Sequence, residues 1–379
     1  MESIPHPHLA PSETFAVTYR LTGTRTEAED KAQALSVEQT IEFPADLVWV
    51  EEISQHIVAR VSRVTEVGRE LFDAELVFSA DIAGTELTQL LNVLFGNASL
   101  LPGVRVQRFE PGPRLVARYR GPRFGVAGLR QLAGAPDRPL LCTALKPMGL
   151  TCAELAELAG RFALGGADFI KDDHGLADQS FSPFLERVQR CAEAVERANR
   201  KTGGRCLYLP NVTAPAGELL ERARTARNAG AGGFLVAPGL VGFDAMRLLA
   251  DDDELGLPIL NHPALQGSFV VRPDQGISHF VLFGQIARLA GADATIFPNY
   301  GGRFSFSKEE CSDAAAGCRA PMGHLAPILP VPAGGMKRSR IAEMVEFYGR
   351  DVMLLIGGDL HRHPDGLVAA CAEFRNAVS

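Results

Sequence analysis

The sequence predicts an α/β protein built from a C-terminal (β/α)8 TIM barrel and an N-terminal α+β ferredoxin-like domain. The chain of 379 residues is long for one ordinary domain and suits a barrel of about 250 residues beside a smaller domain. From residue 139 onward, short apolar runs alternate with helical stretches, whereas strand and helix patterns are mixed before residue 110. We therefore expect an N-terminal domain at residues 1–130 and a barrel at residues 131–379.

The first part of the chain contains patterns of both kinds. Polar and apolar residues alternate as in strands at residues 14–21, 56–67 and 71–79, and leucine and valine have helical spacing at residues 84–97. Glycine and proline punctuate residues 108–139, which we interpret as a connector. Trp49, the only tryptophan, is expected to pack inside the small domain.

The second part has the rhythm of a parallel barrel. Parallel strands that are buried on both faces appear as continuous apolar runs. Helical stretches such as "FLERVQRCAEAVERANRK" lie between the runs. Eight runs are the number that closes a (β/α)8 barrel, and an open doubly wound sheet is the alternative. The predicted strands lie at residues 139–145, 168–173, 206–212, 233–238, 257–262, 294–299, 326–331 and 352–358.

Composition limits the class of protein. Hydrophobic residues make up 46% and charged residues 22% of the chain, as in ordinary globular proteins, and the net charge is -7. Without a basic patch rich in aromatic residues, we expect no nucleic-acid partner. No apolar run reaches 18 residues, so we expect no membrane span. The N-terminus does not resemble a secretory signal and the seven cysteines form no CxxC pair, so we expect a cytoplasmic protein with reduced thiols.

Polar side chains collect where the predicted strands end, which is where such barrels carry their active sites. Lys146 ends the first strand, and Lys171, Asp172, Asp173 and His174 end the second. Carboxylates favour a hard cation such as Mg²⁺, but a protonated lysine repels it. Lysine at this place helps only as a neutral amine or after conversion to an anion. Later strands end in Asn211, Asn261, His262 and Asn299.

Two glycine pairs predict a phosphate site. They are Gly334–Gly335 after the seventh predicted strand and Gly357–Gly358 at the end of the eighth. A phosphate needs a close approach to backbone N–H groups, which glycine permits, and these two loops are the usual phosphate site of a TIM barrel.

Several segments resemble the large subunit of RuBisCO. They include "LLCTALKPMGLT", "GGADFIKDDHGLADQSFSPFLERV" and the glycine-pair segments "AGGM" and "LLIGGDLHRHP". The resemblance implies that Lys171 reacts with CO2 to form a carbamate that ligates Mg²⁺ together with Asp173. It also implies that Lys146 exchanges a proton with the substrate carbon and that His262 lies beside the substrate hydroxyls.

The same resemblance extends to the substrate phosphate and to a partner subunit. Gly335, Gly357 and Gly358 match the glycines that hold a substrate phosphate. "SVEQT" and "LLNVLFGNAS" resemble N-terminal segments that complete the active site of the partner, with Glu38 and Asn97 as the matching residues. A homodimer with shared active sites is therefore expected.

Departures from the carboxylase pattern predict a different reaction. His174 stands where the third metal ligand is a glutamate, and Met148 stands where a second lysine is expected. Pro263 replaces an arginine that grips phosphate, and Ala333 replaces a serine. A different segment, "IFPNYGGRFSFSK", replaces the flexible lysine loop; in it Arg303 or Lys308 could bind an anion. We therefore expect a RuBisCO-like protein that does not fix CO2.

The parts that remain support chemistry through a metal-stabilised enediolate. We rank first a decarboxylase or transcarboxylase/hydrolase of 3-oxo-isoapionate 4-phosphate, because donors in "NYGGR" suit a substrate carboxylate. The alternative is an enolase or isomerase of methylthio-ketose phosphates. Two further readings are a metal-free Schiff-base aldolase, which would use Lys146 or Lys171, and a non-catalytic ligand-binding protein.

Overall fold

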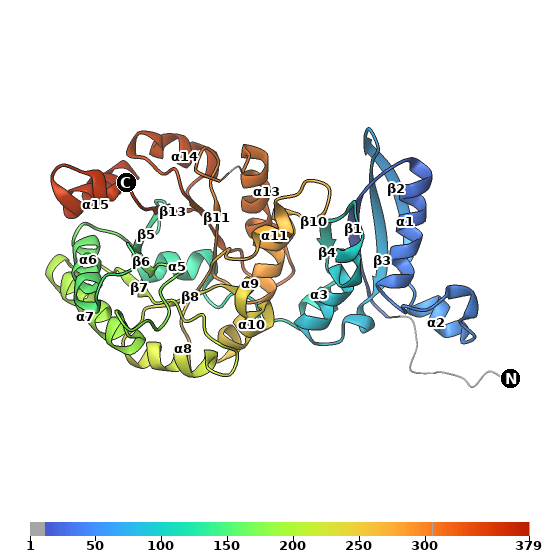
Figure 1. Cartoon of the computed structure of the whole chain (residues 1–379), viewed down its shortest axis with the longest axis horizontal. Helices are drawn as coiled ribbons and strands as arrows, with labels where there is room; N and C mark the ends of the chain where they lie inside the picture. The colour runs from blue at the N-terminus through green and yellow to red at the C-terminus, as the bar shows by residue number, and fades with distance from the viewer. Residues whose placement is uncertain (1–11, 305, 379) are drawn as a thin grey trace. The chain divides into compact units, whose positions relative to one another are not determined.

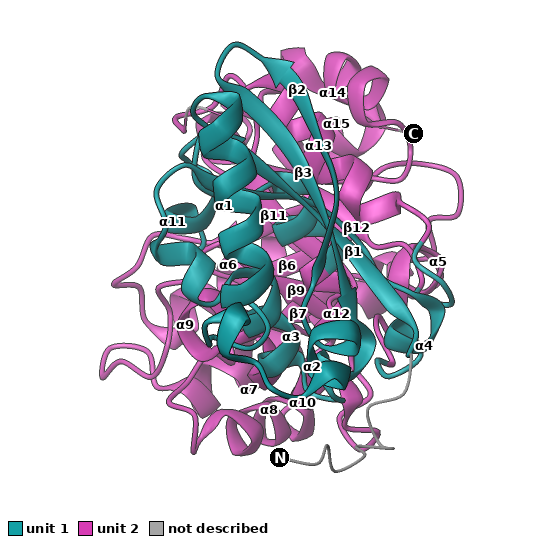
Figure 2. Cartoon of the chain, turned by 90° about the vertical axis from the view of Figure 1, so that its right-hand side faces the viewer, with its two compact units in different colours: residues 1–119, 266–285, 322–325 teal, residues 120–265, 286–321, 326–379 magenta. Residues whose placement is uncertain are grey.

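The computed structural model describes residues 12–304 and 306–378. The chain divides into two compact units, coloured teal and magenta in Figure 2. Unit 1 contains the chain up to Tyr119 together with residues 266–285 and 322–325, and unit 2 contains the remainder. We propose that the boundary between two independently folding domains lies between residues 130 and 131.

Unit 1 has a ferredoxin-like β-α-β-β-α-β order, visible on the right of Figure 1. Its strands pair antiparallel in the order β4-β1-β3-β2, and a short strand pairs parallel with β4 at the edge. The main elements are β1(Thr14–Thr22), α1(Arg25–Glu38), β2(Arg60–Gly68), β3(Leu71–Ser79), α3(Leu87–Phe95), β4(Val104–Glu110) and the edge strand β10(Gly276–Ile277). The short helices are η1(Ala45–Leu47), α2(Glu51–His56), η2(Ala80–Ala83), η3(Asn97–Leu100), α4(Pro113–Val116) and α11(Gly267–Val270).

The sheet of unit 1 follows the predicted alternation. Successive side chains of a strand point to opposite faces, and every second residue of β1 and β3 is buried. Helix α1 packs on β2 and β3 and begins at a capping box, in which Thr24 and Glu27 bond each other's backbone N–H groups. The predicted strands and the predicted helix at residues 84–97 are confirmed.

The expectation for Trp49 is wrong. Its side chain is 79% exposed and meets the ring of Phe43 edge-on, with 6.4 Å between the ring centroids. The segment around it surrounds an apolar hollow of about 460 Å³ lined by Ile41, Phe43, Val48, Trp49, Val50, Ile53 and Ile57. An exposed apolar cluster of this kind is typical of an interaction surface rather than of a core.

Unit 2 is a closed barrel of eight parallel strands, and all eight predicted strands are confirmed. The sheet order is β7-β6-β5-β13-β12-β11-β9-β8, and a bridge between Asn211 and Leu235 joins the two end strands. The strands are β5(Leu140–Leu145), β6(Phe169–Asp172), β7(Leu207–Leu209), β8(Phe234–Val236), β9(Ile259–Asn261), β11(Ala294–Pro298), β12(Leu329–Ala333) and β13(Met353–Ile356).

Helices surround these strands, as α6, α7 and α8 show in Figure 1. They are α5(Gly125–Ala133), α6(Cys152–Leu164), α7(Phe184–Thr202), α8(Leu219–Asn228), α9(Pro238–Val241), α10(Phe243–Asp251), α12(Ala287–Leu289), α13(Lys308–Arg319), α14(Ile341–Tyr348) and α15(Gly366–Ala377). Two short 3-10 helices, η5(Arg338–Arg340) and η6(Leu360–Arg362), also belong to unit 2, whereas the π-helix η4(Phe280–Ile286) belongs to unit 1 except for its last residue. The predicted connector at residues 108–139 is thus partly wrong, because it contains α4 and α5. No helix within the described ranges is both long and apolar enough to cross a bilayer.

Inward-facing side chains fill the barrel and then give way to polar ones at its C-terminal end. The interior cluster includes Leu140 and Cys142 of β5 and Phe169 of β6. Since alternate residues of a strand face the same way, Lys146 continues the inward row of β5, and Lys171 and Asp173 continue that of β6. The packed core therefore ends in a polar layer at the rim where these barrels carry their active sites.

Asp293 ties three parts of the barrel together. It is buried, and its carboxylate accepts hydrogen bonds from the backbone N–H groups of Phe124, Gly125 and Ile259 at 2.6, 2.8 and 2.9 Å. The first two N–H groups lie at the start of α5, and the third begins β9. Burial raises the pKa of Asp293 from 3.8 to about 6, and the three backbone donors oppose that rise.

We predict that Asp293→Asn lowers stability and also changes its pH dependence. The amide would present an N–H₂ group to backbone N–H donors, leaving buried groups unpaired at a cost of about 1–3 kcal/mol. Because the folded state binds this proton more tightly, the contribution of Asp293 to stability falls between pH 3.8 and about 6 and is constant above. Urea unfolding across this range should show that slope in the wild type and not in the variant. Asp137→Asn, at an 86% exposed side chain, is the control, and an identical slope in Asp293→Asn would contradict the assignment.

Candidate active site

Lys146 and Asp173 meet at the C-terminal rim of the barrel. Lys146 Nζ lies 2.7 Å from Asp173 Oδ1, and His174 Nδ1 lies 3.2 Å from the same oxygen. β5 and β6 are neighbours in the sheet, and their register places Ala144 beside Lys171, so the residues that follow emerge side by side. Strand pairing thus brings together two lysines, a carboxylate and an imidazole that the sequence spreads over 29 positions, from 146 to 174.

The carboxylate of Asp173 stays ionised. Burial would raise its pKa, but the neighbouring His174 and Lys146 outweigh burial, so the pKa lies well below its usual range. Oδ1 is buried, and neither close contact has the alignment of a hydrogen bond. This oxygen already has an amine and an imidazole within 3.2 Å.

Lys171 is nearly inaccessible, with 3% of its surface exposed. Its Nζ donates a hydrogen bond to the backbone carbonyl of Asp172 at 3.0 Å. Burial lowers the pKa of Lys171, and the nearby charge of Lys146 acts in the same direction, whereas Cys142, Asp173 and Asp172 oppose the shift. The environment therefore favours the neutral amine, which is the form that reacts with an electrophile.

Two imidazoles lie over one another beside this group. The rings of His174 and His262 stack with 4.4 Å between centroids and 14° between planes. The backbone N–H of Ala264 donates to His262 Nδ1 at 3.1 Å, so Nδ1 is the acceptor and the ring proton sits on Nε2. Burial lowers the pKa of His262 to about 2, so this ring is neutral.

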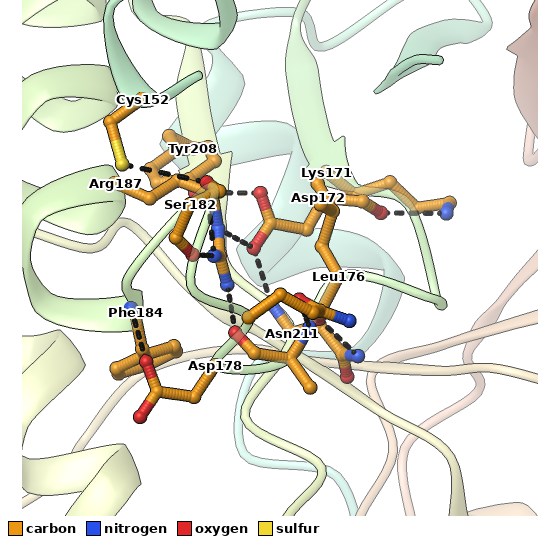
Figure 3. A network of polar contacts seen from close by, with 12 residues as sticks. Cys152, Lys171, Asp172, Leu176, Asp178, Ser182, Phe184, Arg187, Tyr208 and Asn211 are labelled. Carbon is orange, nitrogen blue, oxygen red and sulfur yellow. Dashed lines mark hydrogen bonds and ion pairs between the residues drawn. The ribbon is translucent and has the colours of Figure 1, made fainter. Parts of the chain in front are cut away.

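Asp172 points away from the rim and forms a buried network, shown in Figure 3. Arg187 Nε lies 3.1 Å from its Oδ2, and both side chains are 0% exposed. The hydroxyl of Tyr208 donates to Oδ1 at 2.7 Å, and the backbone N–H of Asn211 donates to Oδ2 at 3.1 Å. The strand alternation therefore makes Asp172 a structural anchor between two site residues.

The loop after β6 is held at both sides. Arg187 donates to the backbone carbonyls of Ser182 and Ala177, each at 2.7 Å. The side-chain amide of Asn211 donates to the carbonyls of His174 at 3.0 Å and Leu176 at 2.9 Å. Its amide hydrogens are thus directed into the loop rather than toward a ligand. These contacts indicate a positioning role for Asn211, and that it also binds substrate stays a prediction.

The two glycine pairs differ in what surrounds them. Gly335 has φ +66°, and a Cβ there would lie 2.9 Å from the Cα of Gly302 in the loop after β11. The fold itself therefore requires glycine at 335. Around Gly357 and Gly358 a Cβ would meet nothing within 4 Å, and neither has a φ in the left-handed region. These two backbone positions are open to an approaching ligand.

The two cations proposed to bind an anion lie near Tyr300 and Phe304. The guanidinium of Arg303 stacks over the Phe304 ring at 4.9 Å. Lys308 Nζ lies 5.0 Å from the Tyr300 ring centroid and 4.0 Å from Glu343. Arg340, which the sequence reasoning missed, donates to the carbonyl of Tyr300 at 3.3 Å. The basic run "KRSR", which begins at Lys337 one residue after the Gly334–Gly335 pair, was the available signal.

Glu38 and Asn97 lie together in unit 1. Asn97 Nδ2 donates to Glu38 Oε1 at 2.8 Å and to Glu42 Oε1 at 3.2 Å. Glu38 is the last residue of α1 and Asn97 the first of η3, so two separate elements bring them together. Their contribution to a partner's site stays a prediction.

No group of three or more His, Cys, Asp or Glu side chains is placed to hold a metal ion in the described part of the chain. Lys171 belongs to none of those four residue types and so would not be part of such a group. At the rim the available donors are the carboxylate of Asp173, the imidazole of His174 and the amine of Lys171.

Comparison with known proteins assigns the chain to a family. Residues 125–379 match the family model "Ribulose bisphosphate carboxylase large chain, catalytic domain". Ribulose bisphosphate carboxylase-like protein 1 of Rhodopseudomonas palustris is 42% identical over 97% of this chain and 98% of its own length. The chain belongs to the RuBisCO large-chain family.

Other RuBisCO relatives carry named activities. The 5-methylthioribulose-1-phosphate isomerase of Rhodospirillum rubrum is 41% identical, with 97% of both chains covered. The 2,3-diketo-5-methylthiopentyl-1-phosphate enolase of Bacillus pumilus is 32% identical and covers 97% of this chain and 92% of its own. Both are RuBisCO-like enzymes that isomerise or enolise.

Solved RuBisCO structures confirm the fold. The crystal structure of the RuBisCO-like protein from Rhodopseudomonas palustris has a TM-score of 0.88 at 40% identity and covers 97% of this chain and 98% of that one. A dimeric archaeal RuBisCO from Hyperthermus butylicus has a TM-score of 0.89 at 25% identity and covers 96% and 90%. The expected RuBisCO-like fold is therefore confirmed.

We predict that Arg187→Met strongly destabilises this RuBisCO-like protein. Removal of one partner would leave the charge of Asp172 buried and uncompensated, at a cost of about 3–5 kcal/mol in the free energy of unfolding. Arg190→Met is the matched control, because Arg190 on the same helix pairs with Glu186 at 2.7 Å but lies on the surface. Chemical unfolding followed by circular dichroism measures both variants. Equal, small losses would show that the network in Figure 3 does not anchor the strand.

Proposed function

We propose that this protein catalyses proton transfer next to the carbonyl of a methylthio-ketose phosphate, with isomerisation of 5-methylthioribulose 1-phosphate as the first candidate. The observation that carries the proposal is the Lys146–Asp173 pair at the barrel rim, where a flexible amine lies beside a buried carboxylate. The 41% identity to the isomerase of Rhodospirillum rubrum supports the choice of substrate. Enolisation of 2,3-diketo-5-methylthiopentyl 1-phosphate uses the same step and is the second candidate, supported by the enolase at 32% identity.

Lys146 is the proposed acid–base group. A hydrogen on the carbon next to a ketone is acidic, and its removal leaves an enediolate or enolate that a positioned amine can reprotonate. Lys146 takes the proton in its neutral form, and Asp173, 2.7 Å away, stabilises the ammonium that results. His262, neutral and with its proton on Nε2, could donate a hydrogen bond to a substrate oxygen.

Lys171 as a carbamate, together with Asp173, would hold Mg²⁺. The unmodified amine offers no oxygen ligand, so the donor set fits Mg²⁺ only after the amine has reacted with CO2. The burial of Lys171 and its lowered pKa support that reaction, because both favour the neutral amine that attacks CO2. His174 lies within reach as a further ligand. When bound, the cation would draw electron density from the substrate carbonyl.

The open backbone at Gly357 and Gly358 is the proposed phosphate grip. A phosphate would approach their backbone N–H groups closely without displacing a side chain. Gly335 contributes a turn whose shape the loop after β11 fixes. A phosphate held at the end of β13 would lie next to β5, the neighbouring strand, which leads to Lys146.

Decarboxylation or hydrolysis of 3-oxo-isoapionate 4-phosphate, ranked first from the sequence, now ranks below the methylthio class. The relatives at 41% and 32% identity bear the names of methylthio-sugar enzymes. We also propose a homodimer in which Glu38 and Asn97 complete the partner's site, in line with the dimeric archaeal RuBisCO. The seven cysteines are unpaired and buried, which suits the proposed cytoplasmic location.

The first experiment tests the substrate and the base together. Purified protein with Mg²⁺ and bicarbonate in D₂O is expected to exchange a carbon-bound proton of 5-methylthioribulose 1-phosphate for deuterium. Proton NMR measures the exchange as the loss of that proton's signal. Lys146→Met should slow this exchange by about 100- to 10,000-fold, the usual worth of a general base. Lys201→Met, on the exposed face of α7, is the control.

Three results would redirect the proposal. Exchange that survives in Lys146→Met would assign the base elsewhere. Turnover of 3-oxo-isoapionate 4-phosphate alone would restore the decarboxylase or hydrolase. Irreversible inactivation by substrate with borohydride would indicate a Schiff-base aldolase.

The phosphate grip has its own test. Gly358→Ala should weaken binding of the phosphorylated ketose, since a methyl group would occupy the approach to the backbone N–H, and it should leave the melting temperature nearly unchanged. Gly217→Ala is the matched control, because Gly217 also has an open surrounding and ordinary φ but lies before α8. Calorimetric titration with the ketose phosphate and with inorganic phosphate measures both variants. Unchanged affinity in Gly358→Ala would remove this residue from the phosphate site.

A further inference from the structure

Met148 is a half-exposed apolar side chain at the mouth of the barrel. It follows Lys146 by two residues in the loop after β5, and 49% of its surface is exposed. Its terminal methyl group lies over the backbone of Gly175, where an added Cβ would collide with Met148 Cε. The side chain therefore reaches from the β5 loop across to the loop after β6.

The end of the Met148 side chain lies beside Gly175. Gly175 has no φ in the left-handed region, so its backbone conformation does not demand glycine. The atoms that a Cβ at this position would meet are Met148 Cε and, at 3.8 Å, Asp173 Oδ2. Met148 Cε thus lies against Gly175 and close to the carboxylate of Asp173.

This pair borders the reacting group. Asp173 Oδ2 lies near the point where the Cβ of residue 175 would stand, and the other carboxylate oxygen lies 2.7 Å from Lys146 Nζ. A thioether is an apolar and polarisable surface that adapts to the shape of its partner. The rim thus offers an apolar surface directly beside the amine.

The sheet order arranges three features along the rim. β13 ends in the open Gly357–Gly358 backbone, its neighbour β5 leads to Lys146, and the next strand, β6, leads to Gly175. A ketose with a phosphate at one end and a methylthio group at the other has its carbonyl between them. With its phosphate at β13 and its reacting carbon at Lys146, its tail would extend toward β6.

We propose that Met148 determines substrate specificity by packing against the methylthio tail of the ketose phosphate. This inference rests on the proposed function, and it names the residue that selects a methylthio group over a hydroxyl. Burying the tail against Met148 removes apolar surface from water, whereas a hydroxyl would lose its hydration there. A difference of about one small apolar group is worth about 10- to 200-fold in kcat/KM.

The test compares two ketoses that differ only at the tail, 5-methylthioribulose 1-phosphate and ribulose 1-phosphate. Met148→Ser should reduce the ratio of their kcat/KM values about 10-fold, mainly through a higher KM for the methylthio compound. Met148→Leu should keep most of the ratio because it restores an apolar side chain of similar volume. Leu248→Ser, at another exposed apolar residue of the barrel on α10, is the control and should leave the ratio unchanged.

Calorimetric titration of the same compounds separates this inference from the proposed function. In one outcome the wild type prefers to bind the methylthio compound, Met148→Ser has no such preference, and neither protein turns over either ketose. This outcome would overturn the proposed reaction and uphold the role of Met148. A ratio that is unchanged in Met148→Ser, both in turnover and in binding, would overturn the role of Met148 alone. Circular dichroism confirms that each variant is folded.

Discussion

The alternation of side chains along β6 is the constraint on which the site depends. Three consecutive residues take different roles because a strand sends neighbours to opposite faces: Lys171 and Asp173 face the barrel mouth, and Asp172 faces the helices. A shift of one residue would bury two site groups among helices and expose the anchor. The ion pair between Asp172 and Arg187 fixes the register of β6, since a buried carboxylate is tolerated only where charged or hydrogen-bonding partners surround it.

The same anchor governs the loop that follows. Arg187 holds two carbonyls of that loop, and the amide of Asn211 holds two more, so the backbone around His174 is tied from two sides. The stacking of His174 on His262 and its contact with Asp173 follow from this fixed path. Precise placement of a few polar groups at the rim thus rests on polar groups that the substrate never meets.

Much of this arrangement could be predicted from the sequence, and the rest depends on three-dimensional packing. Strands buried on both faces leave continuous apolar runs, so all eight were found, and Lys146 and Lys171 were placed at strand ends. Arg187 was missed because a charged residue in a helix is normally exposed, although it shares the apolar spacing of Phe184 and Cys191. The contacts of Asn211 could not be predicted because a strand end does not reveal whether an amide turns toward the mouth or into a neighbouring loop. Gly335 must be glycine because the backbone of Gly302 lies close to it, and the sequence around residue 335 does not reveal this long-range contact.

The exposed position of Trp49 has a practical consequence. Because this is the only tryptophan and its indole is 79% exposed, selectively excited tryptophan fluorescence reports on the segment at residues 41–57 and not on the barrel. Emission should be that of an indole in water and should shift toward shorter wavelengths whenever another surface covers the hollow beside Phe43. The protein therefore carries a native optical probe for events at one apolar surface, readable without any label.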